Sequence, residues 1–183
     1  MKPRSLAWIA AVTGGSLQGA DGWVDAVATD TRALPRPATL PPQAGEGARR
    51  ADGGALFVAL KGENFDGHAH LQAAANGGCV AALVAHPVDV AIAQIIVPNT
   101  ERALADLAAA VQRERSTKLM AITGSNGKPS VKTLLLSILQ QLGGAYANPG
   151  NRNNEIGLPL AVLAAPDDAR FAVYEMGAGK PGG

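Results

Sequence analysis

Short apolar runs alternate with helical patterns along most of the chain. Runs of strand length occupy residues 24–31, 56–60, 80–85, 95–97, 119–122, 145–149 and 171–174. Beside these runs, apolar side chains recur at helical spacing, which predicts helices that begin near residues 5, 68, 100, 128 and 158. Ser5 and Thr100 are suited to cap two of these helices. Such alternation predicts an α/β fold with parallel strands, in which ligands bind at the carboxyl ends of the strands.

Two polar stretches divide the chain. Residues 33–54 are rich in proline, glycine and charge. This composition cannot bury a core, so we expect a flexible loop there. The charged run at residues 113–117 ends a predicted helix and is the expected domain boundary. We therefore expect a small α/β domain over residues 1–115 and the first part of a parallel-sheet domain over residues 116–183.

Composition and charge exclude several classes of partner. The 183 residues carry a formal net charge of +1 and are 47% hydrophobic. We expect no nucleic acid, because no basic excess is present, and no membrane, because no apolar run approaches the roughly 18 residues of a span. Lys2 and Arg4 precede an apolar run as in a signal peptide, but a capped helix is the favoured interpretation. The single cysteine, Cys79, offers no disulfide that would indicate export, so we expect a cytoplasmic protein in which Cys79 is a small buried hydrophobe. We also expect a monomer.

The most informative stretch, ITGSNGKPSVK, covers residues 122–132. An apolar strand runs into a glycine turn that ends in Lys128 and a helix. Glycines permit positive φ and close approach of N–H groups to an anion, and a helix N-terminus favours phosphate. The pattern predicts a phosphate-binding loop, with Lys128 reaching the β- and γ-phosphates of a nucleotide. The loop residues are Thr123, Gly124, Ser125, Asn126, Gly127, Lys128, Pro129 and Ser130. An ordinary glycine turn is the alternative.

Pro129 departs from the usual phosphate loop. The residue after the lysine is normally serine or threonine, whose hydroxyl holds Mg²⁺. Proline is accepted in the first turn of a helix, but it brings neither a hydroxyl nor an N–H group. Ser130 is the nearest replacement as a ligand for the metal.

Four motifs together resemble the Mur ligases of peptidoglycan synthesis. They are the phosphate loop, NPGNRNNEIG at residues 148–157, YEMGA at residues 174–178, and DTR at residues 30–32 followed by FVALKGENFDGH at residues 57–68. The resemblance implies an enzyme in which ATP phosphorylates the terminal carboxylate of UDP-N-acetylmuramoyl-tripeptide. The amine of D-alanyl-D-alanine then attacks the acyl phosphate. The implied cofactors are ATP and Mg²⁺.

The resemblance also implies roles for individual residues. Lys128 would neutralise phosphate oxygens, Glu175 would ligate Mg²⁺ beside Ser130, and Asn154 would help to place nucleotide or metal-bound groups. A UDP pocket in the first domain would be lined by Thr31, Arg32, Asn64, Asp66, Gly67 and His68. Simpler interpretations stand beside these: a solvated arginine, a solvated carboxylate at a strand end, and an asparagine that caps a turn or a helix.

The chain covers only part of the pattern of that family. The family continues through the rest of a central domain and a C-terminal domain, so we expect this chain alone not to complete the reaction. Two alternatives stay open: a generic phosphate-loop kinase or ATPase, and a non-catalytic module that binds a UDP-sugar.

Overall fold

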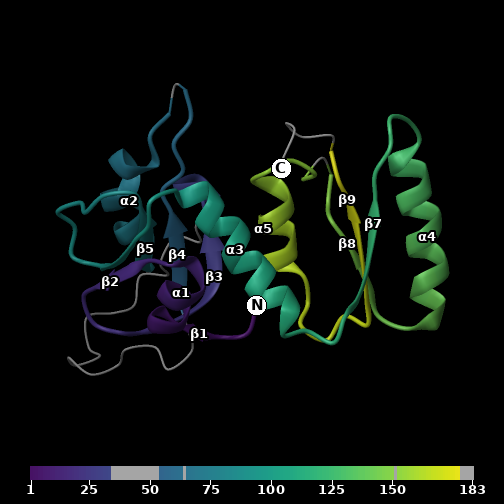
Figure 1. Ribbon diagram of the computed structural model, residues 1–183, viewed down its shortest axis with the longest axis horizontal. Helices are drawn as coiled ribbons and strands as arrows, with labels where there is room; N and C mark the ends of the chain where they lie inside the picture. The colour runs from purple at the N-terminus through teal and green to yellow at the C-terminus, as the bar shows by residue number, and fades with distance from the viewer. Residues whose placement is uncertain (34–53, 64, 151, 178–183) are drawn as a thin grey trace. The chain divides into compact units, whose positions relative to one another are not determined.

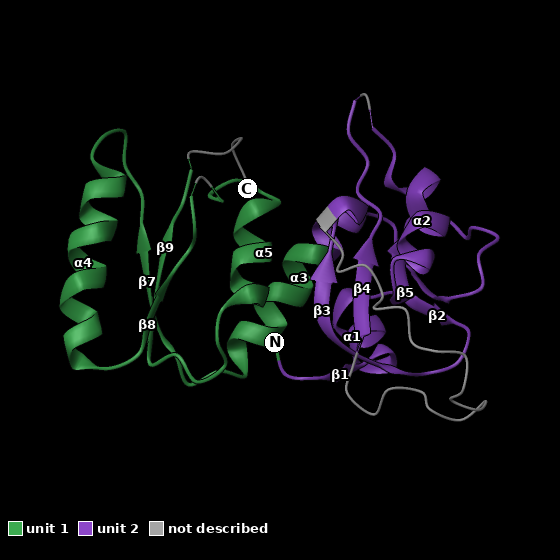
Figure 2. Cartoon of the chain, turned by 180° about the vertical axis from the view of Figure 1, so that it is seen from behind, with its two compact units in different colours: residues 1, 104–183 green, residues 2–103 purple. Residues whose placement is uncertain are grey.

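The computed structural model describes residues 1–33, 54–63, 65–150 and 152–177 (Figure 1). It divides the chain into two compact units, one of residues 2–103 and one of residues 104–183 with residue 1 (Figure 2). The division falls inside helix α3 (Thr100–Arg113), whereas the domain boundary expected from the sequence lies just beyond that helix. Residues 34–53 of the expected loop lie outside the described residues.

The unit of residues 2–103 is built on a six-stranded mixed sheet with the strand order β1-β3-β4-β5-β6-β2. The four inner strands are parallel and are β3 (Trp23–Ala28), β4 (Gly54–Val58), β5 (Cys79–Val84) and β6 (Ala93–Ile96). Helix α2 (Leu71–Asn76) follows a short 3₁₀ helix, η2 (Gly67–His70), between β4 and β5. A second 3₁₀ turn, η1 (Thr31–Ala33), comes after β3, so β3 ends three residues earlier than predicted.

Both edges of this sheet are antiparallel, which the sequence pattern did not predict. Strand β1 (Arg4–Ser5) pairs with β3, and β2 (Ser16–Gln18) pairs with β6. These strands have two and three residues, too few to show an alternation of apolar and polar positions. The predicted α/β fold is confirmed for this unit, and its sheet is parallel in the centre and antiparallel at the two edges.

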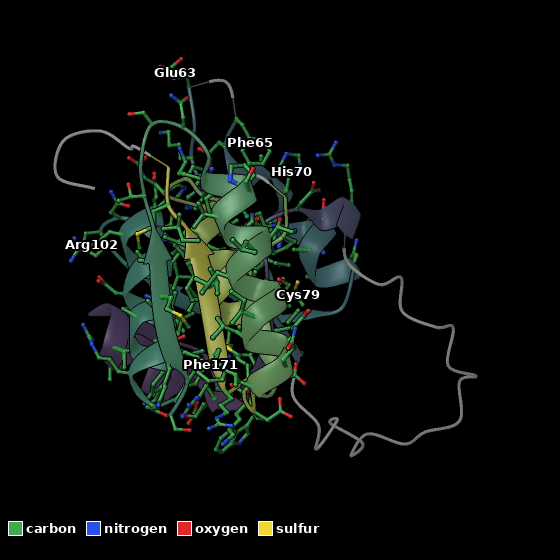
Figure 3. The ribbon with its side chains drawn as sticks, turned by 90° about the vertical axis from the view of Figure 1, so that its right-hand side faces the viewer. Glu63, Phe65, His70, Cys79, Arg102 and Phe171 are labelled. Atoms are coloured by element: carbon green, nitrogen blue, oxygen red, sulfur yellow. The ribbon has the colours of Figure 1, made fainter. Side chains whose placement is uncertain are left out.

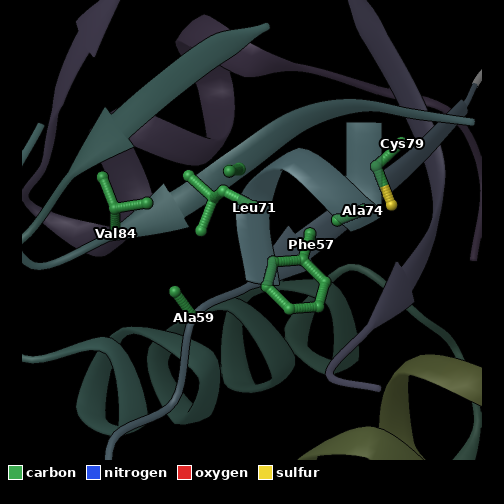
Figure 4. Close-up of a cluster of buried hydrophobic side chains, with 7 residues drawn as sticks. Phe57, Ala59, Leu71, Ala74, Cys79 and Val84 are labelled. Carbon is green, nitrogen blue, oxygen red and sulfur yellow. The ribbon is translucent and has the colours of Figure 1, made fainter. Parts of the chain in front are cut away.

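Apolar side chains bury both faces of the inner strands. On one face, α2 packs against a cluster whose buried members are Phe57, Ala59, Leu71, Ala74, Cys79, Ala82 and Val84 (Figure 4). Leu56 and Val58 alternate with Phe57 along β4 and are fully buried on the other face. Cys79 is a buried hydrophobe, as predicted, and burial raises the pKa of its thiol to about 11.

The cap of α1 (Leu6–Thr13) was predicted correctly, whereas the cap of α3 was assigned to the wrong residue. The Ser5 hydroxyl accepts a hydrogen bond from Trp8 N at 3.1 Å, which confirms Ser5 as the cap of α1. Thr100 is the first residue of α3, and its hydroxyl donates to Ala59 O at 3.0 Å instead. Asn99 Oδ1 accepts from Arg102 N at 2.9 Å, so the cap of α3 lies one residue earlier than predicted.

The second unit contains a three-stranded parallel sheet with the order β7-β9-β8. The strands are β7 (Lys118–Ile122), β8 (Ala145–Ala147) and β9 (Phe171–Glu175). Helix α4 (Lys128–Leu142) covers one face of this sheet, and α5 (Gly157–Ala164) lies on the other (Figure 1). The predicted parallel arrangement is confirmed for this unit.

Helix α4 buries a narrow stripe of its apolar residues. Leu135 and Leu139 pack against Phe171 and Val173 of β9. The other apolar positions of the predicted stripe are half or more exposed: Val131, Leu134, Ile138 and Leu142. None of the helices in the described residues combines the length and the apolar character that crossing a membrane requires.

Gly67 marks a close approach of the backbone that can be tested. A Cβ atom at this buried position would lie 2.8 Å from Ala59 Cα and 2.9 Å from Leu60 N. Because these are backbone atoms, no side chain can swing aside. We expect Gly67→Ala to lower the free energy of unfolding of this unit by about 1–3 kcal/mol. Urea unfolding followed by tryptophan fluorescence measures it, since both tryptophans, Trp8 and Trp23, lie in this unit.

Gly62 provides the matched control. A Cβ atom there would meet nothing within 4 Å, and its φ lies outside the left-handed region. We expect Gly62→Ala to change the free energy of unfolding by no more than about 0.5 kcal/mol. Equal losses in the two variants would contradict the steric argument.

Candidate functional site

The loop between β7 and α4 has the backbone that its glycines predict. Gly124 has a φ of 143° and Gly127 a φ of 76°, values that residues with side chains rarely adopt. A Cβ atom built on either glycine would meet no other atom within 4 Å. The two glycines are therefore needed for the backbone conformation, and the space beside the loop is open.

The loop leads directly into the N-terminus of α4. Gly127 precedes the helix, and its carbonyl oxygen accepts from Val131 N at 3.0 Å. N–H groups in the first turn of a helix have no carbonyl partner within the helix, and the helix dipole favours an anion at this end. Lys128 Nζ donates to Gly124 O at 2.6 Å, which holds a positive charge at the loop. The arrangement suits phosphate.

Pro129 leaves the helix intact, as its position in the first turn predicted. It is the second residue of α4, which continues to Leu142. The first turn nevertheless has one N–H group fewer to offer. The hydroxyl of Thr133 donates to Pro129 O at 2.9 Å, whereas Ser130 is exposed. Ser130 is thus a hydroxyl at the start of the helix that faces solvent.

Glu175 is a buried carboxylate rather than a solvated one. It ends β9 and is 5% exposed, and its register partner is Ile122, the last residue of β7 before the loop. Glu175 Oε2 lies 3.1 Å from Lys132 Nζ, and Oε1 accepts from Asn153 Nδ2 at 3.2 Å. The hydrogen bond from Lys132, chiefly, and that from Asn153 lower the pKa of Glu175 against the opposing effect of burial. An ionised carboxylate beside the phosphate loop suits a hard divalent cation.

Asn148 fixes the main chain of Glu175. Its side chain accepts from Glu175 N at 2.9 Å and donates to Glu175 O at 3.1 Å. It also donates to Arg152 O at 2.8 Å. Asn148 is 1% exposed and follows β8, so it joins the carboxyl ends of β8 and β9.

The structure separates the roles of the two neighbouring asparagines. Asn153 contacts the Glu175 carboxylate, and its carbonyl oxygen accepts from Gly177 N at 2.8 Å. Asn154, the predicted site residue, accepts from Gly157 N at 2.6 Å through its side chain and so holds the turn before α5. Asn154 is exposed.

The residues present fit a nucleotide with Mg²⁺. Open space beside Gly124 and Gly127 accommodates phosphate, and Lys128 supplies compensating charge. No group of three metal-ligating side chains occurs among the described residues. Mg²⁺ commonly takes only one or two protein ligands and completes its shell with phosphate and water, so the Glu175 carboxylate, with Ser130 as the nearest hydroxyl on α4, would be enough to hold it.

A cavity of about 610 Å³ lies at the carboxyl ends of β3 and β4. Of the predicted UDP-pocket residues, Thr31 and Arg32 line this cavity. Its other lining residues are Thr29, Asp30, Phe57, Phe65 and His70. The Phe65 and His70 rings stack with their centroids 5.2 Å apart and a 13° angle between their planes (Figure 3). Stacked rings beside a charged guanidinium suit a nucleoside diphosphate.

Three other predicted pocket residues build the turn beside the cavity rather than its lining. Asp66 Oδ1 accepts from His68 N at 2.9 Å and lies 2.6 Å from His68 Nδ1, and these bonds lower the pKa of Asp66. His68 Nε2 accepts from Ala85 N at 2.9 Å, so both ring nitrogens are occupied. Gly67 is buried in the same turn. Asn64, the last residue of the predicted set, lies outside the described residues.

Sequence reasoning missed several residues of both sites. Lys132 and Asn148 carry the contacts to Glu175, and Phe65 and His70 line the cavity. A signal was present for Phe65 and His70, because Phe65 lies inside the FVALKGENFDGH motif and His70 lies two residues after it. No local pattern marked Lys132, since a lysine on a helix is ordinarily solvated.

Comparison with known proteins places these features in context. A model of the Mur ligase middle domain matches residues 122–182. The UDP-N-acetylmuramoyl-tripeptide–D-alanyl-D-alanine ligase of Escherichia coli is 40% identical over 178 residues, which make up 97% of this chain and 36% of the relative. The Bacillus subtilis ligase of the same name is 42% identical over 126 residues, or 67% of this chain and 27% of the relative. The chain spans about a third of the length of such relatives.

Solved structures of MurF ligases are similar to this chain as well. A crystal structure of MurF from Acinetobacter baumannii superposes with a TM-score of 0.82 at 31% identity, covering 97% of this chain and 36% of that one. MurF ligase from Thermotoga maritima, solved in complex with ADP, gives a TM-score of 0.68 at 27% identity, covering 84% of this chain and 32% of that one.

The pair of Asp30 and Arg32 at the mouth of the cavity gives a pH-dependent prediction. Arg32 Nη2 lies 2.7 Å from Asp30 Oδ2, and this contact lowers the pKa of Asp30 from 3.8 to about 2. Because the folded pKa is the lower one, the pair stabilises the fold above pH 3.8, and its contribution is lost as the pH falls towards 2. Both groups are exposed, so the effect on stability is small.

We expect Arg32→Gln to raise the pKa of Asp30 part of the way towards 3.8, because the guanidinium is lost while the backbone N–H of residue 32 still donates to Asp30 Oδ1. NMR titration of the side-chain carboxyl carbon measures it directly. Lys61→Gln, which removes a positive charge from the turn after β4, is the control and should leave the pKa of Asp30 unchanged. An Asp30 pKa that stays near 2 in Arg32→Gln contradicts the assignment of its cause.

Proposed function

The chain is a homologue of the UDP-N-acetylmuramoyl-tripeptide–D-alanyl-D-alanine ligases with part of a Mur ligase middle domain, and on this premise we propose that it supplies the phosphate-binding and UDP-binding parts of such a ligase. The observation that carries the proposal is the meeting of the phosphate loop and the buried Glu175 carboxylate at one end of the β7–β9 pair. Phosphoryl transfer requires a phosphate cradle next to a ligand for the metal.

The proposed reaction forms an amide bond in two steps. The γ-phosphoryl group of ATP passes to the terminal carboxylate of UDP-N-acetylmuramoyl-tripeptide and releases ADP. The amine of D-alanyl-D-alanine then attacks the acyl phosphate, loses a proton and expels phosphate. A carboxylate is a poor acyl donor until it is activated, so the first step is the one that the phosphate loop serves.

Residues of the loop and the strand ends take separate roles in this proposal. Lys128 and the N-terminus of α4 neutralise and orient the phosphate oxygens. Glu175 would hold Mg²⁺, which when bound neutralises charge on the transferred group, and Ser130 is the nearest hydroxyl that could replace the one missing at position 129. Asn154 contributes to the site indirectly, because its side chain holds the turn that precedes α5.

The cavity beside β3 and β4 is the proposed site for the UDP part of the substrate. Arg32 is a planar donor that matches phosphate oxygens, and Thr31 adds a hydroxyl. Phe65 and His70 present an aromatic surface on which a base can stack. The cavity thus offers a group for each half of a nucleoside diphosphate.

Calorimetric titration with UDP-N-acetylmuramoyl-tripeptide tests the UDP site. We expect saturable binding that UDP competes away. Arg32→Gln removes a charged donor and should weaken binding by about tenfold to a hundredfold, whereas Lys61→Gln should have no effect. Absence of binding to the unchanged chain contradicts this half of the proposal.

Assays of phosphate release separate the competing functions. We expect the chain alone not to join D-alanyl-D-alanine to the tripeptide, because it spans about a third of the length of its relatives. Steady ATP hydrolysis without either co-substrate would favour a generic ATPase. Tight binding of UDP-sugar without any binding of ATP would favour a non-catalytic module.

Pro129 gives a sharper test of the phosphate loop. Threonine at this position restores a backbone donor and a hydroxyl for the metal, so Pro129→Thr should tighten Mg·ATP binding by about tenfold to a hundredfold in calorimetry. Ser130→Ala, made separately, should change it little. If threonine brings no gain and alanine a large loss, Ser130 already holds the ion and Pro129 does not impair the loop.

A further inference from the structure

Lys132 is a largely buried cation that has no role in the reaction proposed above. It lies one turn beyond Lys128 on α4, and its side chain is only 14% exposed. Its ammonium nitrogen is 3.1 Å from Glu175 Oε2, 3.3 Å from Asn148 O and 3.4 Å from Gly150 O. Three oxygens from two separate segments thus surround one charge.

Different groups hold the main chain and the carboxylate of Glu175. Asn148 bonds the N–H and the carbonyl of Glu175 and so fixes its main chain. The carboxylate is placed by Lys132 on Oε2 and by Asn153 on Oε1. Among these contacts, the one from Lys132 comes from the helix that starts at the phosphate loop.

We propose that Lys132 is a positioning residue whose charge holds the Glu175 carboxylate in a fixed place relative to the phosphate loop, as Mg²⁺-dependent nucleotide binding requires. The role toward nucleotide rests on the proposed function. The role toward Glu175 rests on the contacts alone.

Removing the charge of Lys132 would leave the Glu175 carboxylate without its cation. The Glu175 side chain is 7% exposed, and a buried carboxylate without its cation is costly. In Lys132→Met the stem of the side chain remains, but Glu175 keeps only the neutral donor Asn153 and turns towards solvent. Lys132→Arg restores a cation that can reach the same oxygens.

NMR of the ligand-free chain provides the first test. In Lys132→Met we expect a changed carboxyl carbon shift for Glu175 and about tenfold faster hydrogen exchange of the Asn153 side-chain amide. Lys132→Arg should restore both. Lys118→Met, which alters an exposed lysine at the start of β7, should leave both unchanged. If Lys132→Met does not fold, Lys132→Gln replaces it, since glutamine can donate to the carbonyls without carrying charge.

Nucleotide affinity with Mg²⁺ and with EDTA provides the second test, because a merely structural role would weaken both alike. We expect Lys132→Met to lose about tenfold or more in affinity for Mg·ATP but little for metal-free ATP, with rescue in Lys132→Arg. Unchanged Glu175 signals, or equal losses with and without metal, overturn the inference. If the unchanged chain binds no nucleotide, the proposed function fails, and the ligand-free spectra still decide whether Lys132 positions Glu175.

Discussion

The charge of Glu175, buried at the end of β9, has to be balanced within the fold. Taking a carboxylate out of water costs several kcal/mol unless a cation and hydrogen-bond donors replace the lost hydration. Lys132 and Asn153 supply them, from α4 and from the segment after β8. Because each donor belongs to a different segment, satisfying one carboxylate fixes the helix, the turn and the strand end around the phosphate loop.

The unit of residues 2–103 uses a buried histidine in a comparable way. His68 is 6% exposed, and its Nε2 accepts from Ala85 N, which places the ring proton on Nδ1 facing Asp66. These bonds hold the turn that begins η2. Phe65 and His70 flank that turn and line the cavity. Asp66, Gly67 and His68, whose motif suggested contact with substrate, therefore lie in the turn beside the cavity and hold the segment that carries its lining residues.

Local patterns were sufficient to predict the parts of both sites that depend on local conformation. Gly124 and Gly127 adopt the positive φ that their place between a strand and a helix indicates, and Glu175 stands where its strand ends. The α/β fold, matching the N-terminal and part of the middle domain of MurF, was also predictable. Lys132 was not, because its role arises only when α4 packs against β9. The choice between Asn153 and Asn154 likewise depends on which side chain the turn directs towards Glu175.

The spacing of the lysines on α4 is explained by the site rather than by the helix. Lys128 and Lys132 stand four residues apart, so their charges share one face, and such like-charged pairs destabilise a helix by about 0.2–0.5 kcal/mol. The helix dipole adds to the cost, since cations are unfavourable near its N-terminus. Each ammonium is instead drawn to oxygens outside the helix, Lys128 to Gly124 O and Lys132 to the Glu175 carboxylate. Two cations that the helix itself disfavours are therefore held at its N-terminus by acceptors of the loop and the strand end, which lie outside the helix.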